Sequence, residues 1–207
     1  MNYLQGLIMG FAYLAPIGVQ NLFVINTALT QNYKRSIITA LIVIIFDVLL
    51  ALACFFGIGV IMGSSKLIEM LVLLVGSILV ILIGGNLIFS KGKTEAESNV
   101  NITLKKVVST AFVVTWLNPQ AIIDGTMMLG AFRASLAPEE GIKFISGVVS
   151  ASFVWFLGLA LVIKLFSKKI NSQVLRIINI ICGVVIIFYG LKLFYSFVIM
   201  IYPIVFG

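Results

Sequence analysis

The chain has 207 residues, of which 61% are hydrophobic and only 10% are charged. A soluble domain of this size could not cover so much apolar surface, so the composition indicates an integral membrane protein and excludes a soluble globular one. The formal net charge of +7 does not indicate nucleic-acid binding, because the basic residues stand at the ends of apolar runs, where lysine and arginine anchor helices at the headgroups.

Six apolar stretches are long enough to cross a bilayer, since a spanning helix needs about 20 apolar residues. The first begins without the positive n-region of a cleaved signal peptide, so we expect it to remain as a span. The apolar tail after the sixth is too short for a seventh span, and we expect an extended or interfacial continuation there. The predicted spans are Tyr3 to Ala28, Ser36 to Met62, Leu67 to Phe89, Val107 to Phe132, Gly141 to Phe166, and Val174 to about Phe194.

Lysine and arginine are unevenly distributed between the predicted loops. The first, third and fifth loops contain ten of these residues, and the second and fourth loops contain three. By the positive-inside rule, the three basic loops lie in the cytoplasm. Because the number of spans is even, the N- and C-termini are then both predicted outside.

The polar connection at residues 90–106 is the longest in the chain and separates two sets of three spans. We therefore expect one transmembrane transporter domain over residues 1–207, with half-repeats at about 1–90 and 105–196 and a cytoplasmic loop at 90–106. An odd number of spans per half makes the halves antiparallel, so the repeat would be inverted. The expected fold class is an all-α integral membrane protein, with six transmembrane helices as two inverted three-helix repeats.

Each half contains a proline in the middle of its first span, Pro16 and Pro119. Proline removes a backbone donor and clashes with the preceding turn, so helices 1 and 4 should be broken there. Lipid cannot satisfy the freed backbone groups, and a matched pair of interrupted helices therefore predicts the central site of a transporter. A side chain suited to a polar or charged substrate follows five residues after each proline, Asn21 and Asp124.

Asp47 and Asp124 are the two acidic residues inside predicted spans. An ionisable group at that depth costs about 3 kcal/mol or more, so each is a functional candidate. The alternative is a protonated aspartate that only bonds a neighbouring helix. The chain has no histidine and no lysine or arginine near mid-membrane, so neither aspartate has an obvious cationic partner within the protein. The cargo could supply that positive charge. A proton would take its place in the empty site, which makes both aspartates candidates for proton coupling.

Neutral polar groups surround the two breaks. Gly18 permits close approach to the backbone, and the free amides after each proline form partial positive ends suited to a substrate carboxylate. The alternative for each amide side chain is an interhelical hydrogen bond that only holds the bundle together. Trp155 is expected to be a packing residue. The candidate substrate-binding residues are Pro16, Gly18, Gln20, Asn21, Asp47, Asn118, Pro119, Gln120 and Asp124.

Three stretches resemble the signatures of the LysE family of lysine and arginine exporters: Pro16 to Val24, Phe46 to Leu50, and Thr115 to Asp124. The proline-glycine-glutamine-asparagine order of the first stretch is similar to the basic amino-acid branch of that family. Gln120 and Ile123 stand where basic exporters often have a histidine and an aromatic residue. The resemblance implies a multi-pass exporter of L-lysine, L-arginine or a related cation in a bacterial inner or plasma membrane.

We therefore expect proton-coupled alternating access between the two three-helix halves. Moving one positive charge outward against 100 mV costs about 2.3 kcal/mol, and exchange for an incoming proton removes that penalty. On the same fold, the cargo could instead be a neutral amino acid, a small amine or a divalent cation. We expect no enzyme activity, cofactor or metal site, because without histidine only an aspartyl pair could act as a catalyst. The sequence is also compatible with a homo-oligomer.

Overall fold

The computed structural model describes residues 2–15, 18–57, 66–89, 102–130, 132–133, 136–167 and 172–205. The regular elements in these ranges are all helical, as the fold class predicted, and the described residues contain no strand. In chain order the helices are α1 (Asn2–Leu14), α2 (Val19–Thr30), α3 (Tyr33–Phe56), α5 (Lys66–Ile88), α6 (Leu104–Trp116), α7 (Pro119–Gly125), the π-helix η1 (Thr126–Gly130), α9 (Pro138–Ser167) and α10 (Ser172–Val205).

Three helices are long and apolar enough to cross a membrane by themselves: α3, α9 and the Arg176–Tyr202 part of α10. α1 and α2 together form a fourth candidate, a pair whose axes are bent by 79° at the break between them. α5 is apolar over Leu73–Asn86, and the fourth predicted span is divided between α6, α7 and η1. By length and composition, the described residues therefore support three or four of the six predicted spans.

Two predicted span boundaries differ from the structure. α3 ends at Phe56 instead of continuing to Met62, because Gly57 takes the left-handed conformation (φ 109°) and donates its N–H to the Ala53 carbonyl. Glycine adopts that conformation without the steric penalty of a Cβ atom, and so it commonly ends helices. α10 continues through the apolar tail to Val205 as one helix of 34 residues, which is about 51 Å at 1.5 Å per residue.

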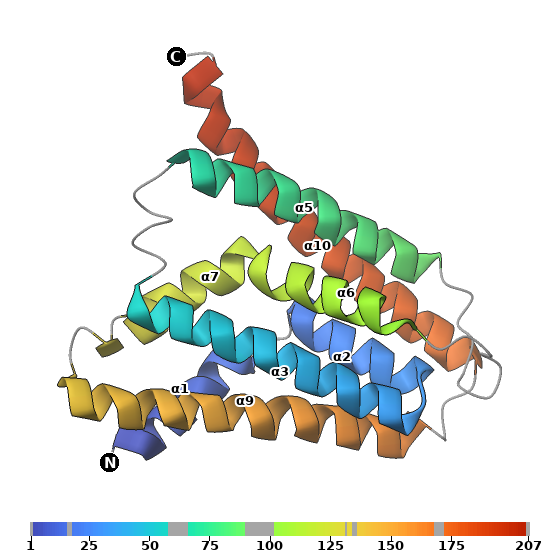
Figure 1. The fold of residues 1–207 in the computed structure, drawn as a ribbon. Coiled ribbons are helices and arrows are strands. Elements are labelled where there is room, and N and C mark those ends of the chain that lie inside the picture. The colour runs from blue at the N-terminus through green and yellow to red at the C-terminus, as the bar shows by residue number, and fades with distance from the viewer. Residues whose placement is uncertain are drawn as a thin grey trace.

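The helices form three groups in space (Figure 1). α5 and α10 lie side by side on one side of the bundle, α1, α3 and α9 lie on the other, and α2, α6 and α7 lie between them. α5 packs mainly on α10, while α9 packs on α1, α2 and α3. α2, α6 and α7 are therefore enclosed by both outer groups.

Glycines allow two helix pairs to approach closely. Where α1 crosses α9, a Cβ atom on Gly10 would lie 2.6 Å from the Cβ atom of Ala151. Where α5 crosses α10, a Cβ atom on Gly84 would lie 2.9 Å from the carbonyl oxygen of Gly183. Cβ atoms do not approach other non-bonded carbon or oxygen atoms this closely, so a larger side chain at either position would push the helices apart.

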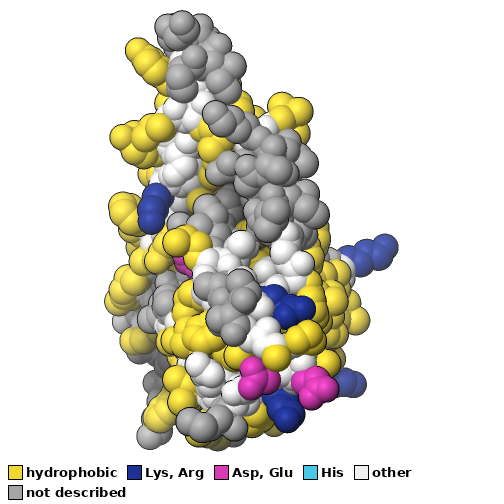
Figure 2. Space-filling view, turned by 90° about the vertical axis from the view of Figure 1, so that its left-hand side faces the viewer, with side chains coloured by type: hydrophobic (Ala, Val, Ile, Leu, Met, Phe, Trp, Pro, Cys, Tyr) yellow, Lys and Arg dark blue, Asp and Glu magenta, His cyan; other side chains and the backbone are white. Residues whose placement is uncertain are grey.

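The described residues that border the basic loops predicted to be cytoplasmic come together at one end of the bundle. The side-chain oxygen of Gln31 accepts a hydrogen bond from the Ile102 N–H over 2.9 Å, and the Gln31 carbonyl accepts one from the Lys164 ammonium. These three residues border the first, third and fifth loops. Figure 2 shows the opposite end, where acidic and basic side chains lie among apolar ones; the exposed Glu139 and Glu140 there belong to the first turn of α9.

Candidate functional site

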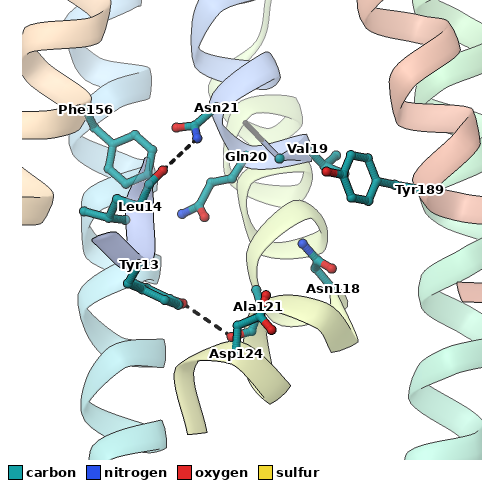
Figure 3. A pocket seen from close by; sticks show the side chains of 11 residues that line it. Tyr13, Leu14, Val19, Gln20, Asn21, Asn118, Ala121, Asp124, Phe156 and Tyr189 are labelled. Carbon is teal, nitrogen blue, oxygen red and sulfur yellow. Dashed lines mark hydrogen bonds between the residues drawn. The ribbon is translucent and has the colours of Figure 1, made fainter. Parts of the chain in front are cut away.

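A cavity of about 100 Å³, here called the central cavity, lies where the end of α1, the start of α2 and α7 meet (Figure 3). This volume has room for several water molecules. Polar side chains reach it from α1, α2, α10 and the segment that begins α7. The residues that line it are Tyr13, Leu14, Gly18, Val19, Gln20, Asn21, Asn118, Ala121, Asp124, Phe156 and Tyr189.

Asn21 connects the end of α1 to α9. Its Nδ2 donates to the Leu14 carbonyl over 3.0 Å, and its Oδ1 accepts from the Trp155 Nε1 over 2.9 Å. The last carbonyls of a helix have no intrahelical partner, so the interruption after α1 leaves Leu14 in need of a donor. Asn21 supplies that donor while remaining almost completely buried. Its observed bonds are therefore those of an interhelical brace, the alternative that the sequence left open for such amides.

Trp155 has a polar role in addition to its packing. Its ring packs edge-on against Phe11 with 6.4 Å between ring centroids, as expected of a packing residue, and its N–H holds the Asn21 carbonyl oxygen. A buried tryptophan N–H generally requires an acceptor. The ring orientation and the Asn21 brace are therefore coupled.

Asp47 lies completely buried on α3, behind the wall of the central cavity. Its Oδ1 accepts a hydrogen bond from Gln20 Nε2 over 3.3 Å, and its Oδ2 accepts one from Ser152 Oγ over 2.6 Å. Gln20 itself lines the central cavity. The Gln20 side chain consequently separates Asp47 from the cavity. The hydrogen bonds from Gln20 of α2 and Ser152 of α9 hold the carboxylate in this position.

Asp124 lies in the wall of the central cavity, one residue before α7 ends and the π-helix η1 follows. Short π-helical segments often occur at functional sites because they re-aim neighbouring side chains. Tyr13 approaches this wall from α1, with its hydroxyl donating to the Ala121 carbonyl over 3.5 Å (Figure 3). Tyr13 therefore joins α1 to the helix that carries Asp124.

α3 packs against α7. The Cys54 thiol lies 3.7 Å from the Ile122 carbonyl oxygen, as a weak donor. A Cβ atom on Gly125 would lie 3.0 Å from that thiol sulfur, so a larger residue would force the Cys54 side chain to shift. Contact with α3 thus helps to position the end of α7, which carries Asp124.

α2 begins at the central cavity. Its N-cap Gly18 is extended (φ −113°, ψ −175°) and has no side chain with which to cap the helix, and Gly18 and Val19 both line the cavity. The first N–H groups of a helix have no intrahelical acceptor and carry a partial positive charge. An anionic group in the cavity would therefore find ready donors there.

The structure brings most of the predicted binding residues to one place. Asp47 reaches the central cavity only through Gln20. The backbone of Pro119 and Gln120 forms the start of α7, while their side chains, and Pro16 altogether, are outside the described part of the chain. Their roles in binding stay predictions. The predicted residues that line the cavity are Gly18, Gln20, Asn21, Asn118 and Asp124.

Sequence reasoning missed several residues of this site. Tyr13 could have been suspected, since it stands three residues before Pro16. Nothing in the sequence marked Ser152, Phe156 or Tyr189, because serines and aromatic residues are common in apolar spans. As for metals, the described residues contain no group of three histidine, cysteine, aspartate or glutamate side chains that could hold an ion.

Comparisons with known proteins agree with the resemblance found in the motifs. Residues 11–197 match the family model described as LysE type translocator. The chain is 34% identical over 200 residues to the arginine exporter protein ArgO of Shigella flexneri and to that of Escherichia coli strain K12, and the aligned region covers 92% of this chain and of each relative. Against the arginine exporter of Salmonella schwarzengrund the identity is 34% over 192 residues, or 88% of both chains.

No solved structure matches the chain. The family model covers most of the sequence, and its translocator description agrees with the apolar helices described above. The protein is therefore a multi-pass membrane transporter and not an enzyme, as predicted. This chain belongs to the LysE type translocator family.

Proposed function

We propose that this chain exports arginine and related cationic L-amino acids across a bacterial inner membrane. The central cavity carries this proposal: Asp124 lies in its wall, Asp47 lies behind Gln20, and the described residues that line it include no lysine or arginine. A cavity with an excess of negative charge at membrane depth suits a cationic cargo. The 34% identity to arginine exporters supports arginine as that cargo.

The central cavity offers separate positions for the two charged ends of such a cargo. The first N–H groups of α2, at Gly18 and Val19, would hold the α-carboxylate. Asp124, which lies across the cavity from Val19 in Figure 3, would pair with the guanidinium or ammonium group of the side chain. Gln20 would contact both the cargo and Asp47, because its side chain lies between the cavity and Asp47.

We infer that export is coupled to an incoming proton. Carrying a bare cation outward against 100 mV costs about 2.3 kcal/mol, and exchange for a proton makes the cycle electrically neutral. Asp47 and Asp124 are the carboxylates placed to carry that proton. Proton and cargo would then exclude one another from the same site.

The packing supports two inverted repeats of three spans. Pseudo-two-fold symmetry would exchange α1 with α6, α2 with α7, α3 with α9, and α5 with α10. The contacts follow this exchange, because α1 packs on α9 as α6 packs on α3, and α2 meets α10 as α7 meets α5. We therefore propose six spans that work by alternating access, with the basic loops in the cytoplasm and both termini outside.

The proposal can be tested with purified protein in lipid vesicles loaded with labelled arginine. We expect Asp124→Asn to slow arginine exchange about 10- to 100-fold, since a charge-assisted hydrogen bond contributes about 1.5–3 kcal/mol. Asp47→Asn should abolish the dependence of exchange on a pH gradient. Exchange at the wild-type rate in both variants would place the binding site elsewhere.

Glu139→Gln is the matched control, because it removes an exposed carboxylate at the end of the bundle and should leave exchange unchanged. The cargo itself is identified by competition. Unlabelled arginine and lysine should compete with labelled arginine, while neutral amino acids, small amines and divalent cations should not. If the wild-type protein transports a neutral amino acid, a small amine or a divalent cation but not arginine, the proposed cargo is wrong.

A further inference from the structure

The helices divide into two bodies that do not coincide with the two sequence halves. α5 and α10 pack mainly against each other through the close crossing at Gly84 and Gly183, and Figure 1 shows this pair on its own side of the bundle. α1, α2, α3 and α9 pack together as the other body. The central cavity lies at the boundary, since Tyr189 of α10 contributes to a wall that otherwise comes from α1, α2, α9 and the α7 region.

A side-chain hydrogen bond crosses this boundary between α2 and α10. Asn26 Nδ2 donates to Asn179 Oδ1 over 2.6 Å, and Asn179 is only 2% exposed. The neighbouring residues on both helices belong to one apolar cluster, which includes Leu22, Cys182 and Ile186. Polar groups that separate in such surroundings lose a partner that lipid cannot replace. The bond therefore favours the arrangement in which α2 and α10 are in contact.

The asparagine pair lies between the central cavity and the basic end of the bundle. Asn26 is seven residues beyond Val19, or about 10 Å along α2, and α2 ends soon afterwards at Thr30. Asn179 is ten residues before Tyr189, or about 15 Å along α10, and therefore lies towards the start of that helix. Any route from the cavity to the basic end between α2 and α10 would therefore pass this pair.

The end of α2 is attached to the larger body. Gln31 accepts hydrogen bonds from the Ile102 N–H, just before α6, and from the Lys164 ammonium on α9. The bond to Asn179, in contrast, joins α2 to the α5–α10 pair. If the two bodies separate at this end, α2 stays with α9 and the Asn26–Asn179 bond is the one that breaks.

We propose that Asn26 and Asn179 form a cytoplasmic latch: the α5–α10 pair moves away from α2 at the basic end, the bond opens, and cargo reaches the central cavity from the cytoplasm. This inference rests on the proposed function and places the moving boundary around α5 and α10, not between the sequence halves. A neutral amide pair suits the task, because it can exchange hydrogen bonds with a passing guanidinium group without trapping it as a carboxylate would.

A reversible cross-link tests the latch. Asn26→Cys and Asn179→Cys are combined in a background with Cys54→Ala and Cys182→Ala, after arginine exchange by that background alone has been measured. A short bifunctional methanethiosulfonate should then slow arginine exchange at least tenfold, and reductant should restore it. The matched control combines Asn26→Cys with Ser196→Cys, an exposed position about 25 Å further along α10 by helical rise, and the reagent should leave its exchange unchanged.

A second measurement does not depend on arginine. A cysteine introduced by Ala121→Cys in the same background is labelled by a membrane-impermeant thiol reagent applied to the basic-loop side. Asn26→Ala and Asn179→Ala should each raise the labelling rate about threefold to tenfold, which is the range expected for one interhelical hydrogen bond in a membrane. Asn86→Ala, an exposed asparagine of α5, is the control and should leave the rate unchanged.

The two measurements separate the latch from the proposed function. Unchanged exchange in the cross-linked protein overturns the latch, and so does an unchanged labelling rate in both alanine variants. Protein that shows the increased labelling but never moves arginine retains the latch and overturns the proposed cargo.

Discussion

The two interrupted spans share a sequence feature but use it differently. Five residues after its proline, the first has Asn21 and the second has Asp124, and both contribute to the central cavity. Asn21 bonds the Leu14 carbonyl and the Trp155 N–H, so its amide is committed to the protein. Asp124 brings a carboxylate to the cavity wall at the end of α7. Asn21 therefore stabilises the backbone at the first break, whereas Asp124 places a carboxylate at the cavity.

This difference follows from what each side chain can donate. A free helix carbonyl needs a donor, which an amide has and an ionised carboxylate lacks. Backbone hydrogen bonds flank both breaks: Leu22 donates to the Gly18 carbonyl over 3.1 Å, and Ile122 donates to the Asn118 carbonyl over 3.3 Å. The Leu14 carbonyl needs a further donor, which Asn21 supplies, so an ionised carboxylate could not replace that amide without losing the bond.

The largest effect should come from exchanging the two side chains, by Asn21→Asp combined with Asp124→Asn. The new carboxylate would face the Leu14 carbonyl without a proton to donate, which should destabilise the fold by about 3 kcal/mol or more. Arginine exchange should be lost as well. Thermal unfolding in detergent and exchange in vesicles measure both. If the exchanged variant keeps wild-type stability and transport, the two breaks are equivalent and the comparison fails.

Removal of the brace alone should have the next largest effect. Asn21→Ala leaves both the Leu14 carbonyl and the Trp155 N–H without their partner, at about 1–3 kcal/mol for a buried unsatisfied group. We expect a corresponding fall in thermal stability. Asn118→Ala, an amide at the other break that also lines the cavity, should change stability by less than about 0.5 kcal/mol. Equal losses in the two variants would contradict the assignment of the brace to Asn21.

Trp155→Phe should cost about 1 kcal/mol, because an aromatic ring remains beside Phe11 but the donor to Asn21 is lost. Trp116→Phe provides the matched control. The buried Trp116 N–H has no hydrogen-bond partner in the described structure, so its removal should be neutral or slightly stabilising. Chemical unfolding of both variants gives the comparison, and a larger loss from Trp116→Phe would reverse our interpretation.

Tyr13→Phe should have the smallest effect. The hydroxyl reaches Ala121 over a long 3.5 Å bond, so its loss should cost less than about 1 kcal/mol and should slow arginine exchange by less than about fivefold. Exchange in vesicles is the measurement. A loss as large as that of Asp124→Asn would show that the Tyr13 hydroxyl holds cargo and does more than connect the two breaks.

Sequence patterns located the site better than they assigned its parts. The proline positions and the aspartates inside apolar spans led to the residues around the central cavity, because breaks and charges are rare at membrane depth. The same patterns could not tell that Asn21 is a brace or that Gln20 separates Asp47 from the cavity. Those distinctions depend on which helix packs against each residue. Ser152, which bonds Asp47, and Trp155, which bonds Asn21, both lie more than a hundred residues further along the chain than their partners.

Composition alone indicated a helical membrane protein, because the bilayer sets the apolar length of a span whatever the helix packs against. Loop charges predicted the orientation, and the motifs pointed to the LysE family. The tertiary structure alone decided how the helices associate. It paired α5 with α10 through Gly84 and Gly183 and joined Asn26 to Asn179. Lipid-facing and helix-facing positions are both apolar in sequence, so helix pairing depends on shape complementarity and a few hydrogen bonds that form only once the bundle is packed.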